Sequence, residues 1–375
     1  MAQKGCCRSA GRKMSQSDSV ICTGPDLEDS LIFLAGTSTC STLAEEPCGG
    51  VAKRIFDTSD LSWTPDFDSF GRHAIPVIDE GRFTLDHVLR PFARGSKAQI
   101  EILLDHAAGD MKILAKRFPC DYLQDDSASF HHSNPQSAED PWTEIFLGLV
   151  LGKQRASREQ DVVPVVPSFG VYRDLQDDVL LLMEWSPGGD LFEISSSLGA
   201  PGPEREETAT QLLCALLEAV TRLHCKGIAH GNICAENAIL RVVGAEVEVV
   251  LIDFAMAVHD TDLSATMGPR GSLMYRAPET VGDNAIYDAR AADLFACGVV
   301  GYVLATGTYP WQSTAGDCKA FAYVQKNGPK KFFDKRTITM GTSKVPVSQV
   351  LSARLQSILA PLLDMNPAER RVLWH

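Results

Sequence analysis

The sequence lacks the features that mark several classes of protein. No apolar run approaches the roughly 20 residues that a membrane-spanning helix needs, and the apolar stretch at residues 30–36 is too short and too far into the chain for a signal peptide. Basic residues are outnumbered, 35 against 48 acidic ones, so the net charge is −13. Nucleic acids and anionic membranes attract cationic surfaces. We therefore predict no nucleic-acid partner and no membrane span.

Cysteines at metal-binding spacing are also absent. None of the 11 cysteines forms a CxxC pair, which disfavours a structural zinc site. Without a secretion signal, their thiols are expected to stay free in a reducing compartment, and we expect a cytoplasmic protein. Cys6 and Cys7 lie beside basic residues, but Ala2 provides no myristoylation signal, so lipidation is disfavoured as well.

The composition changes along the chain. Residues 1–75 are rich in Ser, Thr, Cys, Gly and Asp and show no sustained period, so we expect a disordered or weakly ordered N-terminal extension. Residues 76–375 are predicted to form the folded domain. Within it, the polar segments 125–140 and 152–161 are expected to be surface insertions.

A strand-rich part precedes a helical part. Short apolar segments separated by turn residues lie at 83–92, 98–104, 111–118, 162–172 and 179–185, which is typical of strands. Beyond residue 189, six apolar residues between Leu212 and Leu223 recur at helical spacing. Residues 291–306 are apolar on nearly every side, as in a buried helix. This order predicts an α+β fold with two lobes, an N-lobe at about 80–185 and a C-lobe at about 186–375.

The most specific motifs lie in the second half of the chain. Residues 228–240 read IAHGNICAENAIL, residues 249–255 VVLIDFA, residues 271–279 GSLMYRAPE and residues 293–298 DLFACG, and NPAER follows at 366–370. In this order and spacing they resemble the eukaryotic protein kinase family, whose motifs include His-Arg-Asp with an Asn five residues later, Asp-Phe-Gly and Ala-Pro-Glu. The resemblance covers about residues 80–375. It implies the two-lobed protein kinase fold, with a small antiparallel β-rich N-lobe and a larger helical C-lobe.

The resemblance also implies an ATP site. The segment VLLLMEWSPGGD at residues 179–190 looks like the fifth strand and hinge of a kinase. Met183 would be the gatekeeper, and the backbone of residues 184–186, from Glu184 to Ser186, would hydrogen-bond adenine. Asp190 would hold the ribose or a basic peptide residue. The segment ARGSKAQI at 93–100 keeps one of the family's three phosphate-loop glycines, and alanines at the other two limit close approach of the backbone to phosphate. The further residues implied to contact ATP are Gly95, Ile100, Leu114, Lys116 and Ile239.

Two lysines are candidates for the phosphate-binding cation. Lys116 follows Ile100 by 16 residues (116 − 100), close to the family spacing, and Lys112 is the alternative. Residues i and i−2 of a strand share a face, so Lys112 would place Asp110 over adenine, whereas Lys116 would place Leu114 there. We therefore prefer Lys116, although Leu114 is larger than the family's alanine and is expected to crowd the purine.

The ion-pair partner of this lysine is expected on the next helix. Glu144 is the preferred candidate and Glu139 the alternative. A carboxylate at a helix start is also favoured by the helix dipole alone. One turn later, Gly148 replaces an apolar residue that usually stacks in active kinases.

The resemblance implies that the metal ligands are retained and the groups for chemistry are altered. Asp253 supplies a carboxylate and Asn237 a carbonyl oxygen, both hard ligands suited to Mg²⁺. Asn232 stands at the position of the catalytic aspartate, where its amide can accept a hydrogen bond but cannot take a proton. Cys234 replaces a lysine that steadies the γ-phosphate, and Gly231 replaces an arginine that would pair with an activation-loop phosphate.

Five residues are expected to hold the fold around the site. Glu279 should pair with Arg370 across the helical lobe, and Asp293 should hydrogen-bond the backbone of the catalytic loop. His230 and Phe254 complete this structural set.

Three functions are compatible with these residues. We favour a Ser/Thr-type kinase-like domain that binds Mg·ATP but transfers phosphate poorly or not at all, a pseudokinase acting as scaffold or allosteric regulator of a partner protein. The alternative is an active, atypical Ser/Thr kinase with a protein substrate, in which Asn232 orients the substrate hydroxyl. A third is a binding module that takes no nucleotide, indicated by Leu114 and the altered phosphate loop. The sequence ends at His375, where similar kinases continue through a last helix, so we also expect a slight truncation.

Overall fold

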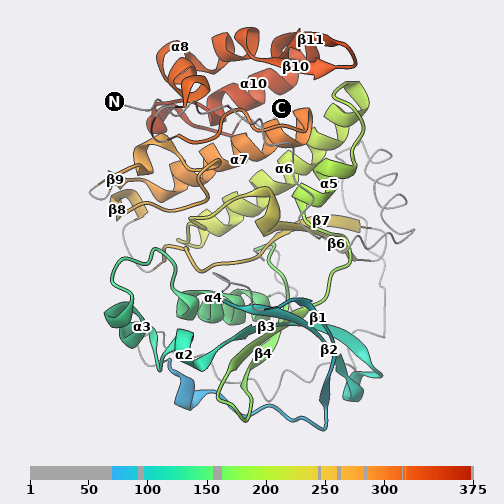
Figure 1. Ribbon diagram of the computed structural model, residues 1–375, viewed down its shortest axis with the longest axis vertical. Helices are drawn as coiled ribbons and strands as arrows, with labels where there is room; N and C mark the ends of the chain where they lie inside the picture. The colour runs from blue at the N-terminus through green and yellow to red at the C-terminus, as the bar shows by residue number, and fades with distance from the viewer. Residues whose placement is uncertain are drawn as a thin grey trace, which may run out of the picture.

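The computed structural model describes residues 70–91, 97–154, 163–243, 246–259, 263–282, 285–314, 316 and 318–372. Two lobes lie one above the other, a sheet-based N-lobe at the bottom of Figure 1 and a helical C-lobe at the top. The predicted two-lobed α+β fold is therefore confirmed. The N-terminal extension up to residue 69, Gly95 and the greater part of segment 152–161 lie outside the described residues.

An antiparallel sheet forms the body of the N-lobe. Its strands are β1 (Phe83–Arg90), β2 (Gln99–Asp105), β3 (Met111–Phe118), β4 (Ser168–Arg173) and β5 (Val179–Glu184), in the order β1-β2-β3-β5-β4. Side chains alternate between faces along each strand. Ile113 and Ala115 of β3 are fully buried on one face, so Leu114 and Lys116 point to the other. Helix α4 (Pro141–Gln154) packs on this second face through residues such as Ile145.

Two short helices, α2 (Cys120–Leu123) and α3 (Ser127–Ser133), connect β3 to α4. Phe130 of α3 is fully buried in the same apolar cluster as Trp142 of α4. The indole N–H of Trp142 donates to the carbonyl of Leu123 at 2.9 Å. The expectation of a mere surface insertion at 125–140 is therefore wrong for this helix, because Phe130 supplies part of the apolar area that α4 buries.

The N-lobe core extends to residues before position 76. Phe70 and Ile75 are each 2% exposed and belong to the cluster around α4. The ring of Phe70 meets Trp142 edge-on, with 5.5 Å between the centroids. Residues 70–75 therefore pack as part of the folded domain.

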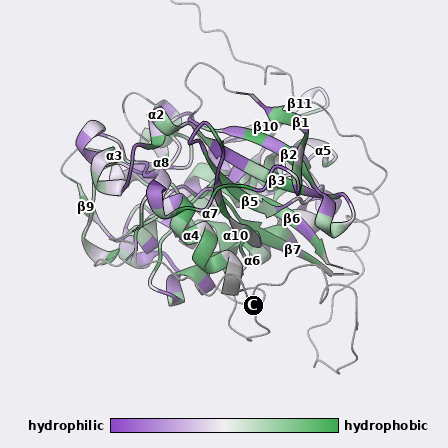
Figure 2. Cartoon of the chain, turned by 90° about the horizontal axis from the view of Figure 1, so that it is seen from below, coloured by the Kyte–Doolittle hydropathy of each residue, from purple (hydrophilic) through white to green (hydrophobic). Residues whose placement is uncertain are grey.

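The C-lobe is built from helices and two-stranded sheets. The helices are α5 (Leu191–Ser197), α6 (Pro203–Cys225), α7 (Ala289–Thr306), α8 (Lys319–Lys335), α9 (Val347–Val350) and α10 (Ala353–Leu362), and the strand pairs are β6 (Ala238–Val243) with β7 (Glu246–Leu251), β8 (Thr266–Met267) with β9 (Ile286–Tyr287), and β10 (Thr337–Met340) with β11 (Ser343–Pro346). The six apolar residues predicted to share one helical face are all buried on α6. Figure 2 shows hydrophobic residues along α7 and α10 in the middle of the view and hydrophilic ones on α3 and α8 at the side.

Helix α7 has the length and apolar composition of a membrane span, alone in this among the helices of the described residues. However, 78% of that stretch is buried inside the lobe, and the core helix of a folded domain passes the same test. It is the buried helix predicted at residues 291–306.

Candidate nucleotide and catalytic site

Lys116 and Glu144 form an ion pair between the sheet and α4. Lys116 lies near the end of β3, and Glu144 lies in the first turn of α4. The ammonium of Lys116 is also 3.5 Å from Oδ1 of Asp253. Burial disfavours the charged ammonium, but Asp253 and Glu144 outweigh it and raise the pKa of Lys116. The cation therefore stays charged between two carboxyl groups.

The two alternative residues lie elsewhere. Lys112 is exposed and lies 3.3 Å from a carboxylate oxygen of Asp86. Glu139 pairs with Lys97 at 2.7 Å, which links the start of β2 to the chain before α4. Neither residue pairs with Lys116 or Glu144, although the charge of Glu139 contributes to the raised pKa of Glu144.

The two carboxyl groups beside Lys116 differ in their proton affinity. Burial raises the pKa of Glu144 to about 7, although the charge of Lys116 acts in the opposite direction. For Asp253, burial is outweighed by Lys116 and the pKa is lowered, so this carboxylate stays ionised. The backbone of Asp253 has φ +66°, a left-handed conformation that costs a non-glycine residue about 1–2 kcal/mol. Such strain is found mostly at functional sites.

Asn237 lies next to the Asp253 segment. The N–H of Ile252 donates to the carbonyl of Asn237 at 3.1 Å. Nδ2 of Asn237 donates to the carbonyl of Asn232 at 3.0 Å, which leaves the amide oxygen for a cation. A carboxylate and an amide oxygen fit Mg²⁺. Within the described ranges, no group of three or more His, Cys, Asp or Glu residues could hold a metal alone, so nucleotide phosphates would have to supply further ligands.

A neutral His230 anchors the catalytic loop. Burial lowers the pKa of this imidazole. Its Nε2 is 2.9 Å from the carbonyl of Ile252, which can only accept, so Nε2 carries the proton. Nδ1 then accepts from the N–H of Asn232 at 3.3 Å. The ring of His230 also packs on Phe254, with 4.9 Å between the centroids, so the loop and the Asp253 segment are held together.

The buried carboxylate of Asp293 also holds the catalytic loop. It accepts the N–H groups of His230 and Gly231 at 2.8 and 2.9 Å. Across the C-lobe, Arg370 pairs with Glu279, with Nη2 donating to Oε2 at 2.7 Å. These are the contacts expected from the sequence.

The side chain of Asn232 contacts the activation segment. Its Oδ1 accepts the N–H and the hydroxyl of Ser272, each at 3.2 Å. Because an N–H can only donate, the oxygen of the amide faces Ser272. Cys234 is 4% exposed, and burial raises the pKa of its thiol well above the usual range. The thiol is therefore neutral and can act neither as a base nor as a cation.

The predicted hinge is fastened to β6. The carboxylate of Glu184 pairs with Arg241, which also pairs with Glu248. The hydroxyl of Ser186 donates to the carbonyl of Leu240 at 2.6 Å. No sequence signal points to Arg241, because an isolated arginine in a strand belongs to no motif.

The predicted adenine-contacting residues come from neighbouring strands. Met183 lies opposite Leu114 in the β3–β5 ladder, and Ile100 lies opposite Lys116 in the β2–β3 ladder. Directly opposite residues share one face of a sheet. A small cavity is lined in part by Met183 and Gly148, and a Cβ added at Gly148 would meet Leu181 at 3.1 Å.

Asp190 lies at the start of α5 and forms a bridge with Ile239. Its carboxylate accepts the N–H of Glu193 at 2.8 Å and so caps the helix. Burial, together with the charges of Glu193 and Glu236, raises the pKa of Asp190 to about 6. Asp190 is therefore ionised at neutral pH and available to a hydroxyl or a cation.

Comparison with known proteins agrees with this geometry. The profile of the protein kinase domain matches residues 155–373, more than half of the chain. The chain therefore belongs to the protein kinase family.

Curated relatives include Ser/Thr protein kinases. The chain is 28% identical to the mitosis inducer protein kinase cdr1 of Schizosaccharomyces pombe over 224 residues, 60% of this chain and 33% of that protein. It is 28% identical to CBL-interacting protein kinase 31 of Oryza sativa subsp. japonica over 195 residues, 51% of this chain and 38% of that protein. Testis-specific serine/threonine-protein kinase 3 of Homo sapiens is 24% identical over 218 residues, 58% of this chain and 75% of that protein. The chain thus spans about a third of the length of the first two relatives.

Proposed function

We propose that this kinase domain binds Mg·ATP, transfers phosphate poorly or not at all, and acts as a pseudokinase, a scaffold or allosteric regulator of a partner protein. The observation that carries the proposal is Asn232, an uncharged amide in the catalytic loop whose oxygen already accepts two hydrogen bonds from Ser272. An amide cannot take a proton near neutral pH. The site can therefore orient a hydroxyl but not deprotonate it.

Nucleotide binding is supported by the groups around Lys116. Its ammonium is charged and would bind the phosphates, while Asp253 and Asn237 would hold Mg²⁺, which neutralises phosphate charge when bound. Hinge backbone at Glu184 and Ser186 is fastened by their side chains and would receive adenine. One finding argues against nucleotide binding. Leu114 lies on the same sheet face as Met183, where its side chain would crowd the purine.

Weak transfer follows from the missing groups. A positioned base contributes about 10²–10⁴-fold in rate, which corresponds to about 3–5 kcal/mol of barrier. The neutral Cys234 also leaves the developing phosphate charge without one cation. Both losses act on chemistry rather than on binding.

The alternative proposal, an active but atypical Ser/Thr kinase with a protein substrate, has one specific observation in its favour. The Lys116–Glu144 pair is formed and Asp253 is 3.5 Å from the same ammonium. Because the transition state of phosphoryl transfer is loose, positioning and charge contribute more than proton removal. Some transfer could then persist with Asn232 orienting the substrate hydroxyl.

One experiment separates these proposals. The full chain is incubated with labelled ATP and Mg²⁺ and a generic protein substrate, beside an Asp253→Ala control, while a thermal shift with Mg·ATP reports binding. A shift without transfer supports the pseudokinase. Transfer that disappears in the control establishes the active kinase instead. The absence of any shift for a folded protein would leave only the binding module that takes no nucleotide.

A further inference from the structure

Three stretches of chain meet at the side chain of Arg270. This residue lies in the activation segment, two positions before Ser272. Its Nη1 donates to the carbonyl of Met256 at 2.8 Å and to the carbonyl of Ala138 at 3.2 Å. Met256 follows Asp253 by three residues, and Ala138 precedes helix α4. One guanidinium thus joins the stretch that carries Asp253, the approach to the helix that carries Glu144, and the segment that contacts Asn232.

Two further hydrogen bonds tie the same stretches together. The N–H of Asp140 donates to the carbonyl of Ala255 at 2.6 Å. The N–H of Gly271 donates to the sulfur of Met256 at 3.2 Å. Arg270 therefore lies at the centre of a junction in which residues 138–140, 255–256 and 270–271 contact one another.

The backbone at Gly231 makes room for this junction. Gly231 has φ +72°, and a Cβ added there would lie 2.2 Å from the carbonyl oxygen of Met256 and 3.5 Å from Cδ of Arg270. The oxygen that Arg270 binds thus occupies the place where a side chain at 231 would begin. The catalytic loop carries no side chain here, and the arginine that binds this oxygen comes from the activation segment.

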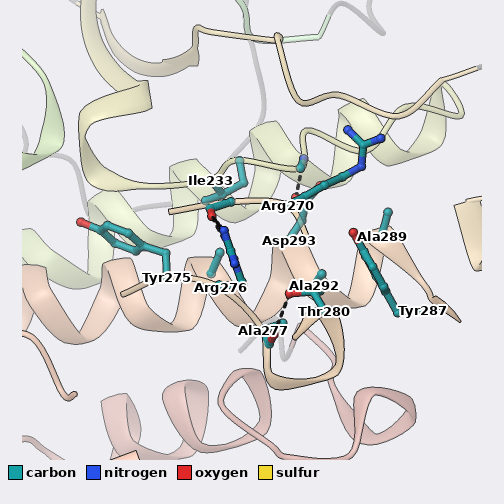
Figure 3. A pocket seen from close by; sticks show the side chains of 13 residues that line it. Ile233, Arg270, Tyr275, Arg276, Ala277, Thr280, Tyr287, Ala289, Ala292 and Asp293 are labelled. Atoms are coloured by element: carbon teal, nitrogen blue, oxygen red, sulfur yellow. Dashed lines mark hydrogen bonds between the residues drawn. The ribbon is translucent and has the colours of Figure 1, made fainter. Parts of the chain in front are cut away.

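The hydrogen bonds of Arg270 differ from those of the second arginine in the same pocket. The guanidinium of Arg276 donates to the carbonyl of Gly271, at 3.1 and 2.7 Å, and so binds within its own segment. Figure 3 shows the two arginines reaching to different sides of the pocket. Burial lowers the pKa of Arg270, and the group that acts in the opposite direction is the hydroxyl of Tyr287, which lines the same pocket. The guanidinium is therefore held by the carbonyls of Met256 and Ala138 and by the hydroxyl of Tyr287.

We propose that Arg270 is a positioning residue, which holds the Asp253 stretch, the start of α4 and the activation segment in register. The site then keeps its geometry without a phosphorylated residue in the activation segment. An effect of Arg270 on Mg·ATP binding rests on the proposed function, whereas the linkage of the three stretches through its hydrogen bonds does not.

The test measures local amide exchange in the full chain after phosphatase treatment. Arg270→Met keeps the aliphatic stem and removes the donors, Arg270→Lys keeps the charge but loses the forked geometry, and Arg276→Ala is the matched control from the same pocket. We expect Arg270→Met to speed exchange about tenfold or more at the amides of Asp140 and Gly271, with the core of α7 unchanged. Arg270→Lys should be intermediate, and Arg276→Ala should match the wild type in peptides covering residues 136–144 and 253–258.

Unchanged exchange in Arg270→Met, or an equal increase in Arg276→Ala, would overturn the proposal. A loss of protection in the wild type after phosphatase treatment would also overturn the proposal, because slow exchange would then depend on phosphorylation. A second measurement compares ATP affinity with and without Mg²⁺. Arg270→Met should reduce the affinity gained from Mg²⁺ by about fivefold and leave the metal-free affinity unchanged. If wild type binds no nucleotide, the proposed function fails while the exchange results still decide the role of Arg270.

Discussion

Asn232 and Ser272 are joined by two hydrogen bonds to a single oxygen, from the N–H and the hydroxyl of Ser272 to Oδ1 of Asn232. The same donors would serve a carboxylate at position 232 at least as well, because hydrogen bonds to a charged acceptor are stronger. They would also favour its ionised form. The surroundings of position 232 are therefore already suited to an aspartate.

The first prediction restores that acid. Asn232→Asp should raise the rate of phosphate transfer at least tenfold, because it adds a group able to accept the proton of the substrate hydroxyl. Initial rates with labelled ATP give the measurement, and the double variant with Asp253→Ala shows whether the gain depends on the metal carboxylate. No gain would mean that Cys234, the altered phosphate loop or the region of α4 limits transfer.

A second prediction concerns the neighbouring glycine. Gly231→Ala should destabilise the protein more than Gly227→Ala, although both positions have positive φ, +72° and +75°. The conformational cost of about 1–2 kcal/mol is common to both. Only at Gly231 would the added Cβ meet an atom, the carbonyl oxygen of Met256 at 2.2 Å, whereas the space at Gly227 is open. We expect a further loss of about 1–3 kcal/mol at Gly231 in urea unfolding. Equal losses in the two variants would contradict this account.

The third prediction is a pH dependence that originates at Asp190. Its pKa of about 6 in the fold lies above the ordinary value of 3.8, so the folded state binds its proton more tightly than the unfolded chain. The tighter proton binding stabilises the folded state. Its contribution to the free energy of unfolding is fully present below about pH 3.8 and is lost as the pH rises through about 6. Asp190→Asn keeps a good helix cap and removes the titration.

Relative to Asp190→Asn, the wild type should therefore lose on the order of 1–2 kcal/mol of unfolding free energy between pH 4 and pH 7. Denaturant unfolding at four or five pH values measures it. A difference that stays flat over this range would show that Asp190 titrates near its ordinary value.

The fourth prediction compares two ion pairs. The side chain of Arg370 is fully buried and that of Glu279 is 15% exposed, so Glu279→Gln leaves a buried cation without its partner. Such a loss costs about 3–5 kcal/mol. The exposed Arg222–Glu218 pair on α6 is the control, and Glu218→Gln should cost at most about 0.5 kcal/mol. A loss below about 1 kcal/mol for Glu279→Gln would mean that other contacts fix the C-lobe.

Local patterns were enough to predict the order of the lobes and the faces of their elements. Alternation in residues 111–118 indicated a strand, and six apolar residues between Leu212 and Leu223 indicated one buried helix face. Ordered motifs indicated the kinase family and the contacts of Asp293 and Glu279. These signals are readable because the period of the backbone decides which residues share a face.

Sequence patterns could not show how α3 contributes to the core or how Arg270 acts. Phe130 lies in a polar stretch, and one buried aromatic there has no periodic neighbours to reveal it. Arg270 binds carbonyl groups of Ala138 and Met256, 132 and 14 positions away, and carbonyl acceptors carry no side-chain signature.

The sequence by itself determined the family, the strand that carries Lys116, and the amide of Asn232 at the position where the resemblance implies an aspartate. Only the tertiary structure decided which partners these residues meet. Glu144 rather than Glu139 pairs with Lys116, Ser272 meets Asn232, and Arg270 joins the stretches around them. Periodicity fixes the direction in which a side chain points, whereas its partner depends on how distant elements pack, and that packing is settled by the whole chain at once.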